Sequence, residues 1–376
     1  MRVLHLIGAA EDSGGILAML RSLQRAPALR EWRHTVWVNA AYRETRQPAL
    51  DYRYSRHLRS ECDPHLRLAW HAWRALGELR ALLQREPFDL LHAHSRGALL
   101  VAMMVATRWR RRVLFTSHGR GKRTWLYARA GKLRRLYVVP LTHEMARHYR
   151  LREDPPRIQI ISACCADAFF SAPLVPPRFT PAGSLPLRLA GVGNIVRWKN
   201  WDLALRALAL LPAPDRRRVK FTLWGPVVAE PDARRFAAEL RRLIAAEGLG
   251  DQVELAGPTN AIGEAIQAAD WLLHPTTNEP CSVGLMEGLA LGRPAVVSAS
   301  GGSVEIVAHG KTGLHFAPGS AEDLAAKLGM ILRGEPQLLP PAAIRESVRP
   351  RSATCVAEAY ARLYGAILGA EPPPPA

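Results

Sequence analysis

Apolar residues in this chain gather in short runs separated by amphipathic segments of helical length. Short, continuous apolar runs are typical of strands buried on both faces, and apolar positions repeated every three or four residues are typical of helices. In the first half this pattern predicts helices at 16–23 and 66–84, and strands at 3–8, 34–39, 88–94, 113–119, 136–142 and 157–163. Strands that alternate with helices predict an α/β domain built on a parallel sheet.

The same alternation begins again after a proline-rich stretch. Strands are expected at 187–193, 219–224, 252–256, 271–274 and 295–297, and helices at 201–211, 233–247, 321–332 and 352–368. A chain of 376 residues is too long for one ordinary hydrophobic core. We therefore expect two domains, at 1–170 and 187–351, joined by a linker at 171–186 in which prolines prevent regular structure.

One junction between a loop and a helix in the second domain carries candidate chemistry. A buried strand is expected to end before Pro275, and Ser282 suits the N-cap of a helix that ends at Gly292 and Pro294. In an open parallel sheet such a loop lies at the carboxyl edge, where ligands bind. Because free N–H groups at a helix start favour anions, we expect a phosphate to contact the amides of Cys281, Ser282, Val283 and Gly284.

Two glutamates flank this junction. Glu279 precedes the helix, and Glu287 lies about 7.5 Å along it from Ser282, at a rise of ~1.5 Å per residue. Carboxylates accept hydrogen bonds from hydroxyl groups. The arrangement suits a ligand that carries a sugar on one side of a diphosphate and a ribose on the other.

These glutamates also carry a resemblance to a known family. Their spacing, followed by Gly292-Arg293-Pro294, Gly301-Gly302 and Lys311-Thr312-Gly313, resembles the E-x7-E signature of retaining glycosyltransferases of family 4. That family has the GT-B fold, in which two Rossmann-like domains with doubly wound parallel sheets face a central cleft. The resemblance implies transfer of a sugar, with retention, from a nucleotide diphosphate sugar to a hydroxyl of a glycan or glycolipid acceptor in bacterial cell-envelope synthesis. It also implies that the last helix, 352–369, crosses back to the first domain.

The resemblance extends to a loop that would hold the diphosphate. Residues 193–200 align with the family's G-R-L-x-x-x-K-G segment, whose Arg and Lys contact the diphosphate and neutralise the leaving group. Lys199 matches the Lys, whereas Asn194 replaces the Arg and cannot supply its charge. Arg197 is the candidate substitute. Ser282 stands where many family members have glycine, and its hydroxyl could donate to phosphate.

The remaining site residues are also assigned by resemblance. Glu279 would hold the hydroxyls of the donor sugar, and Glu287 would hold the ribose. Gly14 and Gly15 match a glycine loop that faces the donor diphosphate in the family, although an ordinary turn would use the same residues. His118 follows a strand and precedes a glycine, and in family members such a histidine lies against the donor sugar. A histidine with satisfied bonds in the core is the alternative for His118.

Neither a metal nor another cofactor is expected. The chain has no D-x-D motif that could bridge Mg²⁺ to a diphosphate, and basic groups can take the metal's role. Because one fold supports many reactions, two alternatives stay open. One is a different GT-B enzyme, such as a nucleotide-sugar 2-epimerase or a phosphorylase, and the other is a non-catalytic basic protein that binds nucleic acid or membrane.

The net charge of +18 is concentrated in the first half of the chain. Residues 1–170 hold 30 Lys and Arg against 14 Asp and Glu, whereas the rest of the chain holds 21 against 19. Basic and aromatic residues interleave from Arg108 to Tyr137, which suits an anionic membrane surface. A phosphate-rich acceptor or nucleic acid would use the same groups, and a solvated helix face or a coding bias toward Arg would need no partner. We favour the membrane surface and place nucleic acid last.

The cysteines and the N-terminus favour a cytoplasmic protein. The five cysteines show neither a disulfide framework nor zinc-ligand spacing, which fits a reducing compartment. The first apolar run is too short and too soon followed by acidic residues to be a signal peptide. We expect a cytoplasmic enzyme that associates peripherally with the cytoplasmic face of the inner membrane.

Overall fold

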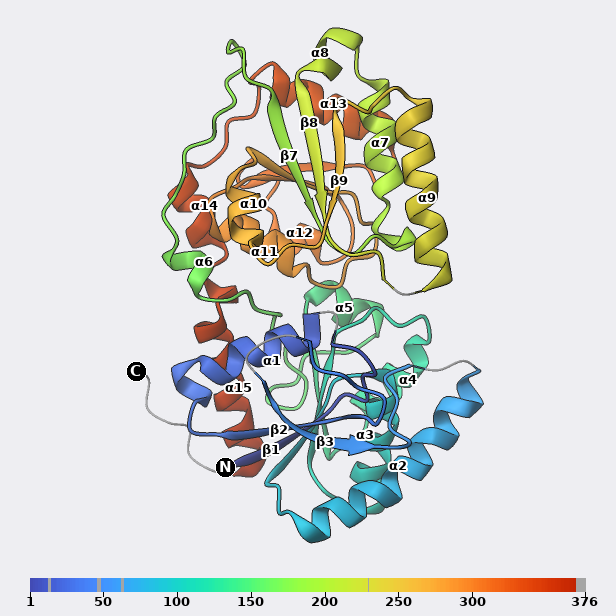
Figure 1. The fold of residues 1–376 in the computed structure, drawn as a ribbon. Helices are drawn as coiled ribbons and strands as arrows, with labels where there is room; N and C mark the ends of the chain where they lie inside the picture. Colours follow the sequence, from blue (N-terminus) through green and yellow to red (C-terminus); the bar gives the residue numbers. More distant parts are fainter. Residues whose placement is uncertain (13–14, 46–48, 62–63, 229, 370–376) are drawn as a thin grey trace. The chain divides into compact units, whose positions relative to one another are not determined.

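The computed structural model describes residues 1–12, 15–45, 49–61, 64–228 and 230–369. The chain divides into two compact units (Figure 1). The first holds the residues from Met1 to Cys164 together with the C-terminal segment from Ala353, and the second holds Cys165–Ser352. The stretch expected as a linker, 171–186, thus lies within the second unit.

Six parallel strands form the sheet of the first unit, in the order β3-β2-β1-β4-β5-β6. The strands are β1 (Arg2–Leu6), β2 (Arg33–Asn39), β3 (Asp51–Ser55), β4 (Leu90–Ala93), β5 (Val113–Ser117) and β6 (Leu136–Pro140). The strand order reverses between β1 and β4. Open α/β sheets bind ligands beyond the carboxyl ends of the strands at such a switch point.

Helices cover this sheet, and the last of them comes from the far end of the chain (Figure 1). They are α1 (Gly15–Arg25), α2 (His65–Arg85), α3 (Arg96–Arg108), α4 (Thr124–Gly131), α5 (His143–His148) and α15 (Ala353–Leu368), with a 3-10 turn η1 (Pro27–Leu29). Helix α15 packs against α1 and η1. Its Tyr360 and Tyr364 hydroxyls bond to Thr116 and His92 of the sheet, so the C-terminal helix is part of the first unit.

The second unit repeats the same strand order. Its parallel sheet runs β12-β11-β10-β7-β8-β9, from β7 (Leu187–Val192), β8 (Val219–Trp224), β9 (Val253–Gly257), β10 (Trp271–His274), β11 (Ala295–Ser298) and β12 (Gly313–Phe316). The helices are α6 (Ala168–Ser171), α7 (Trp201–Leu210), α8 (Ala213–Arg217), α9 (Pro231–Ala246), α10 (Ile262–Gln267), α11 (Val283–Ala290), α12 (Ser303–Ile306), α13 (Ala321–Leu332) and α14 (Pro341–Ser347), with 3-10 turns η2 (Arg197–Lys199) and η3 (Arg349–Arg351). Its switch point lies between β7 and β10.

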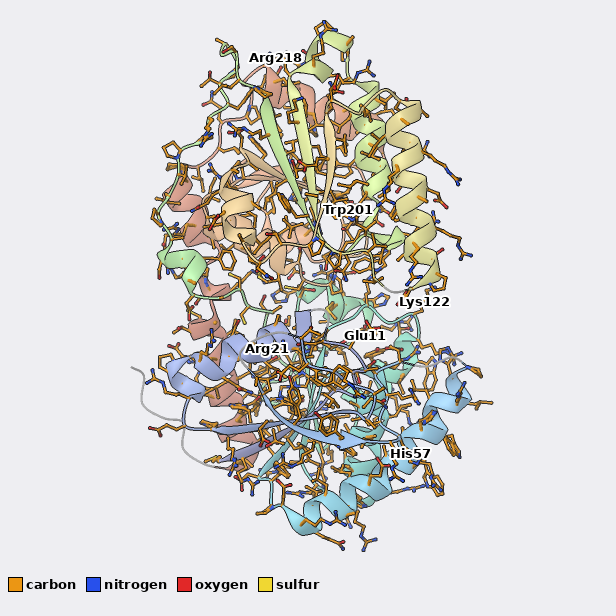
Figure 2. All side chains as sticks on the ribbon, viewed as in Figure 1. Glu11, Arg21, His57, Lys122, Trp201 and Arg218 are labelled. Atoms are coloured by element: carbon orange, nitrogen blue, oxygen red, sulfur yellow. The ribbon has the colours of Figure 1, made fainter. Side chains whose placement is uncertain are left out.

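Local patterns explain these elements. All four residues of β10 are buried, as expected for a central parallel strand. In α9 the buried Ala233, Phe236, Ala237 and Leu240 repeat every three or four residues, while arginines occupy the exposed positions. Trp201 opens α7 and is fully buried in the core of the second unit (Figure 2). No helix in the described ranges is long and apolar enough to cross a membrane.

Two expectations about strands need correction. The segment 157–163 was expected to be a strand, but it makes an isolated bridge, Val138 with Ile158, because the chain turns back on itself where Asp154 pairs with Ile158. Strand β3 was not expected, since the polar and Arg-rich segment that contains it shows no apolar run. As an edge strand, β3 needs little apolar surface.

Candidate active site

The loop after β10 carries a buried glutamate that is held by a lysine. Glu279 is 6% exposed, and its Oε2 accepts a hydrogen bond from Nζ of Lys199, which is 8% exposed. His274, the last residue of β10, places Nε2 3.3 Å from the same oxygen. The other oxygen, Oε1, has no partner among the described residues of the site. Glu279 therefore keeps one acceptor oxygen free for a ligand.

The Glu279 carboxyl is ionised despite its burial. Burial alone would raise its pKa, but the positive charge of Lys199, together with the close approach of His274 Nε2, outweighs that effect and holds the pKa of Glu279 at about 2. Burial lowers the pKa of His274, so this imidazole is neutral at pH 7. The centre of the site is thus a buried lysine–glutamate ion pair. Such a pair is stable only while both partners are present.

Two loops at the switch point of the second sheet build this ion pair. Lys199 lies in η2, after β7, and Glu279 lies after β10, the strand next to β7. Asn200 joins the loops, since its Nδ2 donates to Thr277 Oγ1 at 3.1 Å and to the Pro275 carbonyl at 3.4 Å. Asn200 adopts a left-handed conformation with φ of 54°. Sequence reasoning missed Asn200 and His274, although an Asn before a helix is a recognisable turn signal.

A glycine turn after β11 fixes the backbone of Glu279. The Gly302 N–H donates to the Glu279 carbonyl oxygen at 2.7 Å. Gly301 has φ of +59°, and a Cβ atom there would lie 2.5 Å from that oxygen. Only glycine fits at position 301 without displacing Glu279.

The start of α11 presents free amides next to this loop. Ser282 caps the helix as expected, with its Oγ accepting from the Leu285 N–H at 3.3 Å. The amides of Val283 and Gly284 follow, where an α-helix has no internal acceptor for them. Gly284 lies close to Val192 at the end of β7, since a Cβ atom on Gly284 would be 3.1 Å from Val192. The helix start therefore adjoins the ends of both switch-point strands.

The second glutamate, Glu287, lies one turn further along α11. Its side chain is partly exposed, and no described residue bonds to its carboxylate. Burial raises its pKa to about 7. Glu287 is costly to ionise because it has no partner. Hydroxyl groups that donate hydrogen bonds to its carboxylate would stabilise the ionised form.

Three other predicted site residues take part in none of the contacts described above, and a fourth lies outside the described residues. Arg197 is about half exposed and forms a bidentate ion pair with Glu239 of α9, at 2.9 and 3.0 Å. Asn194 is partly buried, and its backbone carbonyl accepts from Trp201 Nε1. Gly15 is exposed at the start of α1, and Gly14 lies outside the described residues. The predicted ligand contacts of these residues stay predictions.

His118 lies in the first unit, directly after β5. Its Nε2 is 3.0 Å from Nδ1 of His94, and burial lowers its pKa to about 3. The imidazole is therefore neutral at pH 7. The residue is partly exposed.

The fold of this chain is similar to that of solved enzymes. A sucrose-phosphate synthase from Thermosynechococcus elongatus superposes with a TM-score of 0.80 at 18% identity, over 98% of this chain and 99% of that one. HepE from Anabaena, solved in complex with UDP and glucose, gives a TM-score of 0.72 at 18% identity, over 96% of this chain and 98% of that one. The two parallel six-stranded sheets with flanking helices define the GT-B fold.

The family follows from sequence comparison. The family model described as Glycosyl transferases group 1 matches residues 186–346, and the model described as Glycosyltransferase Family 4 matches residues 13–163. The chain belongs to family 4 of the glycosyltransferases.

Curated relatives agree with this family. A D-inositol 3-phosphate glycosyltransferase of Jonesia denitrificans is 26% identical over 305 residues, which is 73% of this chain and 69% of the relative. The lipopolysaccharide glucosyltransferase WaaG of Escherichia coli K12 is 30% identical over 149 residues, which is 39% of this chain and 38% of WaaG. These relatives transfer sugars, so the epimerase, phosphorylase and non-catalytic alternatives are not favoured.

Proposed function

We propose that this chain transfers a sugar, with retention and without a metal ion, from a nucleotide diphosphate sugar to a hydroxyl of a cell-envelope glycan or glycolipid. The observation that carries the proposal is the buried Lys199–Glu279 pair beside the open start of α11. It joins a fixed cation, free amides and an acceptor carboxylate at the switch point of one sheet. The HepE complex contains UDP, so UDP and UDP-glucose are the first probes to test.

Lys199 and the helix start would stabilise the departing diphosphate. As the bond between the anomeric carbon and the diphosphate oxygen breaks, negative charge develops on that oxygen. The acceptor hydroxyl bonds to the anomeric carbon and passes its proton to an oxygen of the departing diphosphate. Groups fixed where charge develops lower the barrier more than mobile groups do. The Lys199 ammonium has three protons, so it can bond to Glu279 and to a phosphate oxygen together. The amides of Val283 and Gly284 would add two further donors.

The two glutamates would hold the ends of the donor. Glu279 Oε1 would accept from hydroxyls of the donor sugar, and Glu287 would accept from the ribose hydroxyls. We assign neither as a general base. Burial keeps water away from the Glu279 carboxylate, which strengthens its bond to a hydroxyl.

Retention is tested by the anomeric configuration of the product. Incubation with UDP-glucose and an oligosaccharide acceptor, followed by proton NMR during the first turnovers, should show the α-configuration of the donor in the product. A product of β-configuration would contradict the proposal.

Metal independence is tested by chelation. Within the described residues, one group of His, Cys, Asp or Glu side chains has metal-ligand spacing, and this group contains none of the Glu279 site residues. We expect EDTA to leave transfer unchanged, because Lys199 and the helix amides supply the charge. Loss of transfer in EDTA that Mg²⁺ restores would contradict this assignment.

We also propose that the first unit associates with an anionic membrane on the cytoplasmic face. Helix α2 exposes Leu66, Trp70 and Trp73, which repeat every three or four residues and so share one face. A groove of about 540 Å³ lies beside them, lined by Arg56, His57, Trp73, Arg74, Leu76, Gly77, Glu78, Arg80 and Trp109. Exposed tryptophans together with arginines suit the headgroup region of an anionic bilayer.

Vesicle sedimentation tests the membrane proposal. The protein should bind vesicles of phosphatidylglycerol and phosphatidylcholine, and added salt should weaken the binding. The double variant Trp70→Ser and Trp73→Ser should bind less, whereas the solvent-exposed change Trp198→Ser in the second unit should not matter. Equal binding to neutral vesicles would contradict the proposal.

A further inference from the structure

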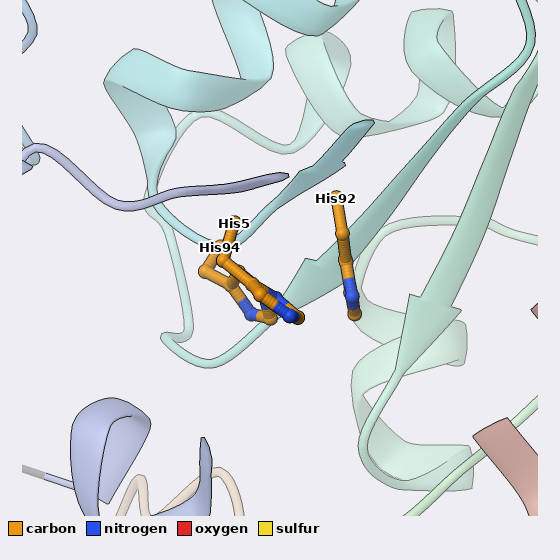
Figure 3. Close-up of side chains that lie close together, drawn as sticks. All are labelled: His5, His92 and His94. Atoms are coloured by element: carbon orange, nitrogen blue, oxygen red, sulfur yellow. The ribbon is translucent and has the colours of Figure 1, made fainter. Parts of the chain in front are cut away.

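Two groups of polar side chains in the first unit lie outside the Glu279 site. One is the buried group of His5, His92 and His94, which have metal-ligand spacing (Figure 3). Both nitrogens of each of these rings lie within 3.0 Å of another polar side chain, so the three histidines are satisfied without a ligand. The other group lines the groove of about 540 Å³ on α2, here named the α2 groove.

Charge in the α2 groove is unbalanced. Arg56, Arg74 and Arg80 line it together with one carboxylate, that of Glu78. The Glu78 carboxylate already accepts a hydrogen bond from Ser55 Oγ. Arg56 and Arg80 are exposed, and no described residue forms an ion pair with either of them. Two unpaired guanidinium groups in one groove favour a phosphate, because each can bond two of its oxygens.

The third arginine is held in place by aromatic neighbours. Arg74 Nε donates to His57 Nε2 at 3.5 Å, and its guanidinium carbon lies 5.8 Å from the ring centroid of Trp70. His57 also stacks edge-on against Trp70, with ring centroids 5.6 Å apart, and lies next to α2 (Figure 2). This wall of the groove is therefore formed before any ligand binds.

Tryptophans continue the groove into an apolar surface. Trp73 of α2 and Trp109, which directly follows α3, line the groove, and Trp73 is 54% exposed. Trp70 and Leu66 precede Trp73 by three and seven residues, share its face of α2, and are also exposed. Indole rings suit the boundary between polar headgroups and acyl chains. A phosphate site bordered by such a surface fits a phospholipid better than a soluble anion, which would leave the apolar residues in water.

Gly77 keeps the groove open. It lies inside α2 and lines the groove, and a Cβ atom at this position would meet nothing within 4 Å. Neither close packing nor a positive φ therefore requires glycine here. Glycine inside a helix costs stability relative to other residues. The space that a side chain at position 77 would occupy belongs to the groove, so a ligand can use it.

We propose that the α2 groove binds the phosphodiester headgroup of one anionic phospholipid. Arg56 and Arg80 bond to the phosphate oxygens, Trp73 and Trp109 pack against the glycerol, and the exposed Trp70 meets the first acyl methylenes. The inference rests on the proposed membrane association and adds a defined lipid site to it. A headgroup held in this way anchors the first unit in addition to the diffuse attraction between its basic residues and the bilayer.

A short-chain lipid tests the groove without a membrane. Dihexanoyl-phosphatidylglycerol below its critical micelle concentration, added to the intact chain labelled with [15N]tryptophan, should shift the indole signals of Trp73 and Trp109, assigned with Trp→Phe variants. Dihexanoyl-phosphatidylcholine and glycerol 3-phosphate should each bind at least tenfold more weakly. Equal affinity for glycerol 3-phosphate would indicate a site for soluble anions and overturn the lipid assignment.

A substitution at Gly77 tests whether the groove itself is used. Gly77→Leu should lower the affinity for dihexanoyl-phosphatidylglycerol about tenfold, while the Tm stays the same or rises because leucine is the better helix former. Ala69→Leu adds the same side chain at an exposed position of α2 outside the groove lining, and it should keep the natural affinity. Equal affinities in Gly77→Leu and the natural chain would overturn the proposal.

Paired arginine variants separate a defined site from overall charge. The double change Arg56→Gln and Arg80→Gln should lower the affinity at least tenfold. The double change Arg67→Gln and Arg85→Gln removes the same charge from exposed positions of α2 outside the groove lining, and it should have little effect. Equal losses in the two double variants would contradict a defined site.

Vesicle sedimentation distinguishes failure of the groove from failure of membrane association. Gly77→Leu should bind phosphatidylglycerol vesicles more weakly than the natural chain does. If both bind these vesicles equally, membrane association stands and the groove proposal fails. If the natural chain does not bind them, both proposals fail, and the sugar transfer assigned to the Glu279 site is unaffected by either result.

Discussion

At the scale of single residues, the site depends on two glutamates in opposite electrostatic states. Lys199 keeps Glu279 ionised with a pKa of about 2, whereas burial without a partner raises the pKa of Glu287 to about 7. The Glu279 pair therefore stabilises the fold at neutral pH, and this contribution is lost as the pH falls from about 4 toward 2. Glu287 has the reverse effect and costs stability when it ionises.

The first prediction concerns Glu287→Gln. Because the folded pKa of about 7 exceeds the unfolded value of about 4.3, the folded chain binds more protons between them, and its stability falls as pH rises through this range. Glu287→Gln should remove that loss and raise the free energy of unfolding at pH 8 by about 1–3 kcal/mol. The same change should weaken UDP binding about tenfold, since an amide accepts hydroxyls less strongly than a carboxylate.

Urea denaturation at pH 5 and pH 8, combined with calorimetric UDP titration, checks this prediction. The stabilisation should be clear at pH 8 and small at pH 5. If Glu287→Gln changed the free energy of unfolding equally at pH 5 and pH 8, ionisation of Glu287 would not be what destabilises the fold.

The second prediction concerns the cation at the diphosphate. Lys199→Met should lower kcat by about 10²–10³, because a charge fixed at the leaving group is removed. It should also destabilise the fold by about 3–5 kcal/mol, since Glu279 is left buried and unpaired. Lys220→Met, which removes an exposed lysine from β8, is the control and should leave kcat unchanged.

The variant Arg197→Met extends that experiment and tests whether Arg197 acts on the diphosphate. If Arg197 leaves Glu239 and replaces the family's missing arginine, the kcat of Arg197→Met should fall as steeply as that of Lys199→Met. If kcat changes less than about threefold, Lys199 and the helix amides act without it.

At the scale of elements, the sequence predicts the strands, helices and caps of the site better than the contacts between them. The strand that ends at His274, the Ser282 cap and the end of α11 shortly before Gly292 all follow from local patterns. The pairing of Arg197 with Glu239 joins residues 42 positions apart on different elements, and no local pattern records it. The hydrogen bonds of His5 with His34 and His94, and of His94 with His118, were missed for the same reason, since they depend on the order of the strands in the sheet.

The third prediction uses two glycines with similar backbone angles. Gly301 and Gly310 have φ of +59° and +70°, but a Cβ atom would meet the Glu279 backbone at Gly301 and open space at Gly310. Gly310→Ala should cost about 1 kcal/mol of stability from backbone strain alone and leave activity intact. Gly301→Ala should cost more and also lower kcat, because Glu279 must move.

Thermal unfolding and initial rates measured side by side check this pair. Equal losses of stability and equal rates in both variants would mean that the glycine turn does not position Glu279.

At the scale of the whole molecule, the C-terminal helix completes the first unit. Helix α15 buries Val356, Tyr360, Leu363, Tyr364 and Ile367 against residues of that unit. The packing of the C-terminal helix on the first unit is expected from the family resemblance alone. The amphipathic pattern of a helix does not show which of two cores the helix covers. The basic excess of residues 1–170 belongs to the same unit, which is why we place membrane association there.

The fourth prediction follows from that arrangement. A chain that ends at Ser352 loses α15 and should lose hydrogen-exchange protection throughout residues 1–164. The second unit should keep its protection, since its core has no part of α15. Uniform loss of protection across both units would show that they do not fold as separate bodies.

The central claim is that the Lys199–Glu279 pair and the start of α11 hold a nucleotide diphosphate. Hydrogen exchange of the intact chain with and without UDP, read by mass spectrometry, tests it most directly. UDP should slow exchange in peptides that cover residues 193–200 and 275–288, and Glu279→Gln should reduce that protection. Protection that appears elsewhere and leaves both peptides unchanged would contradict the account.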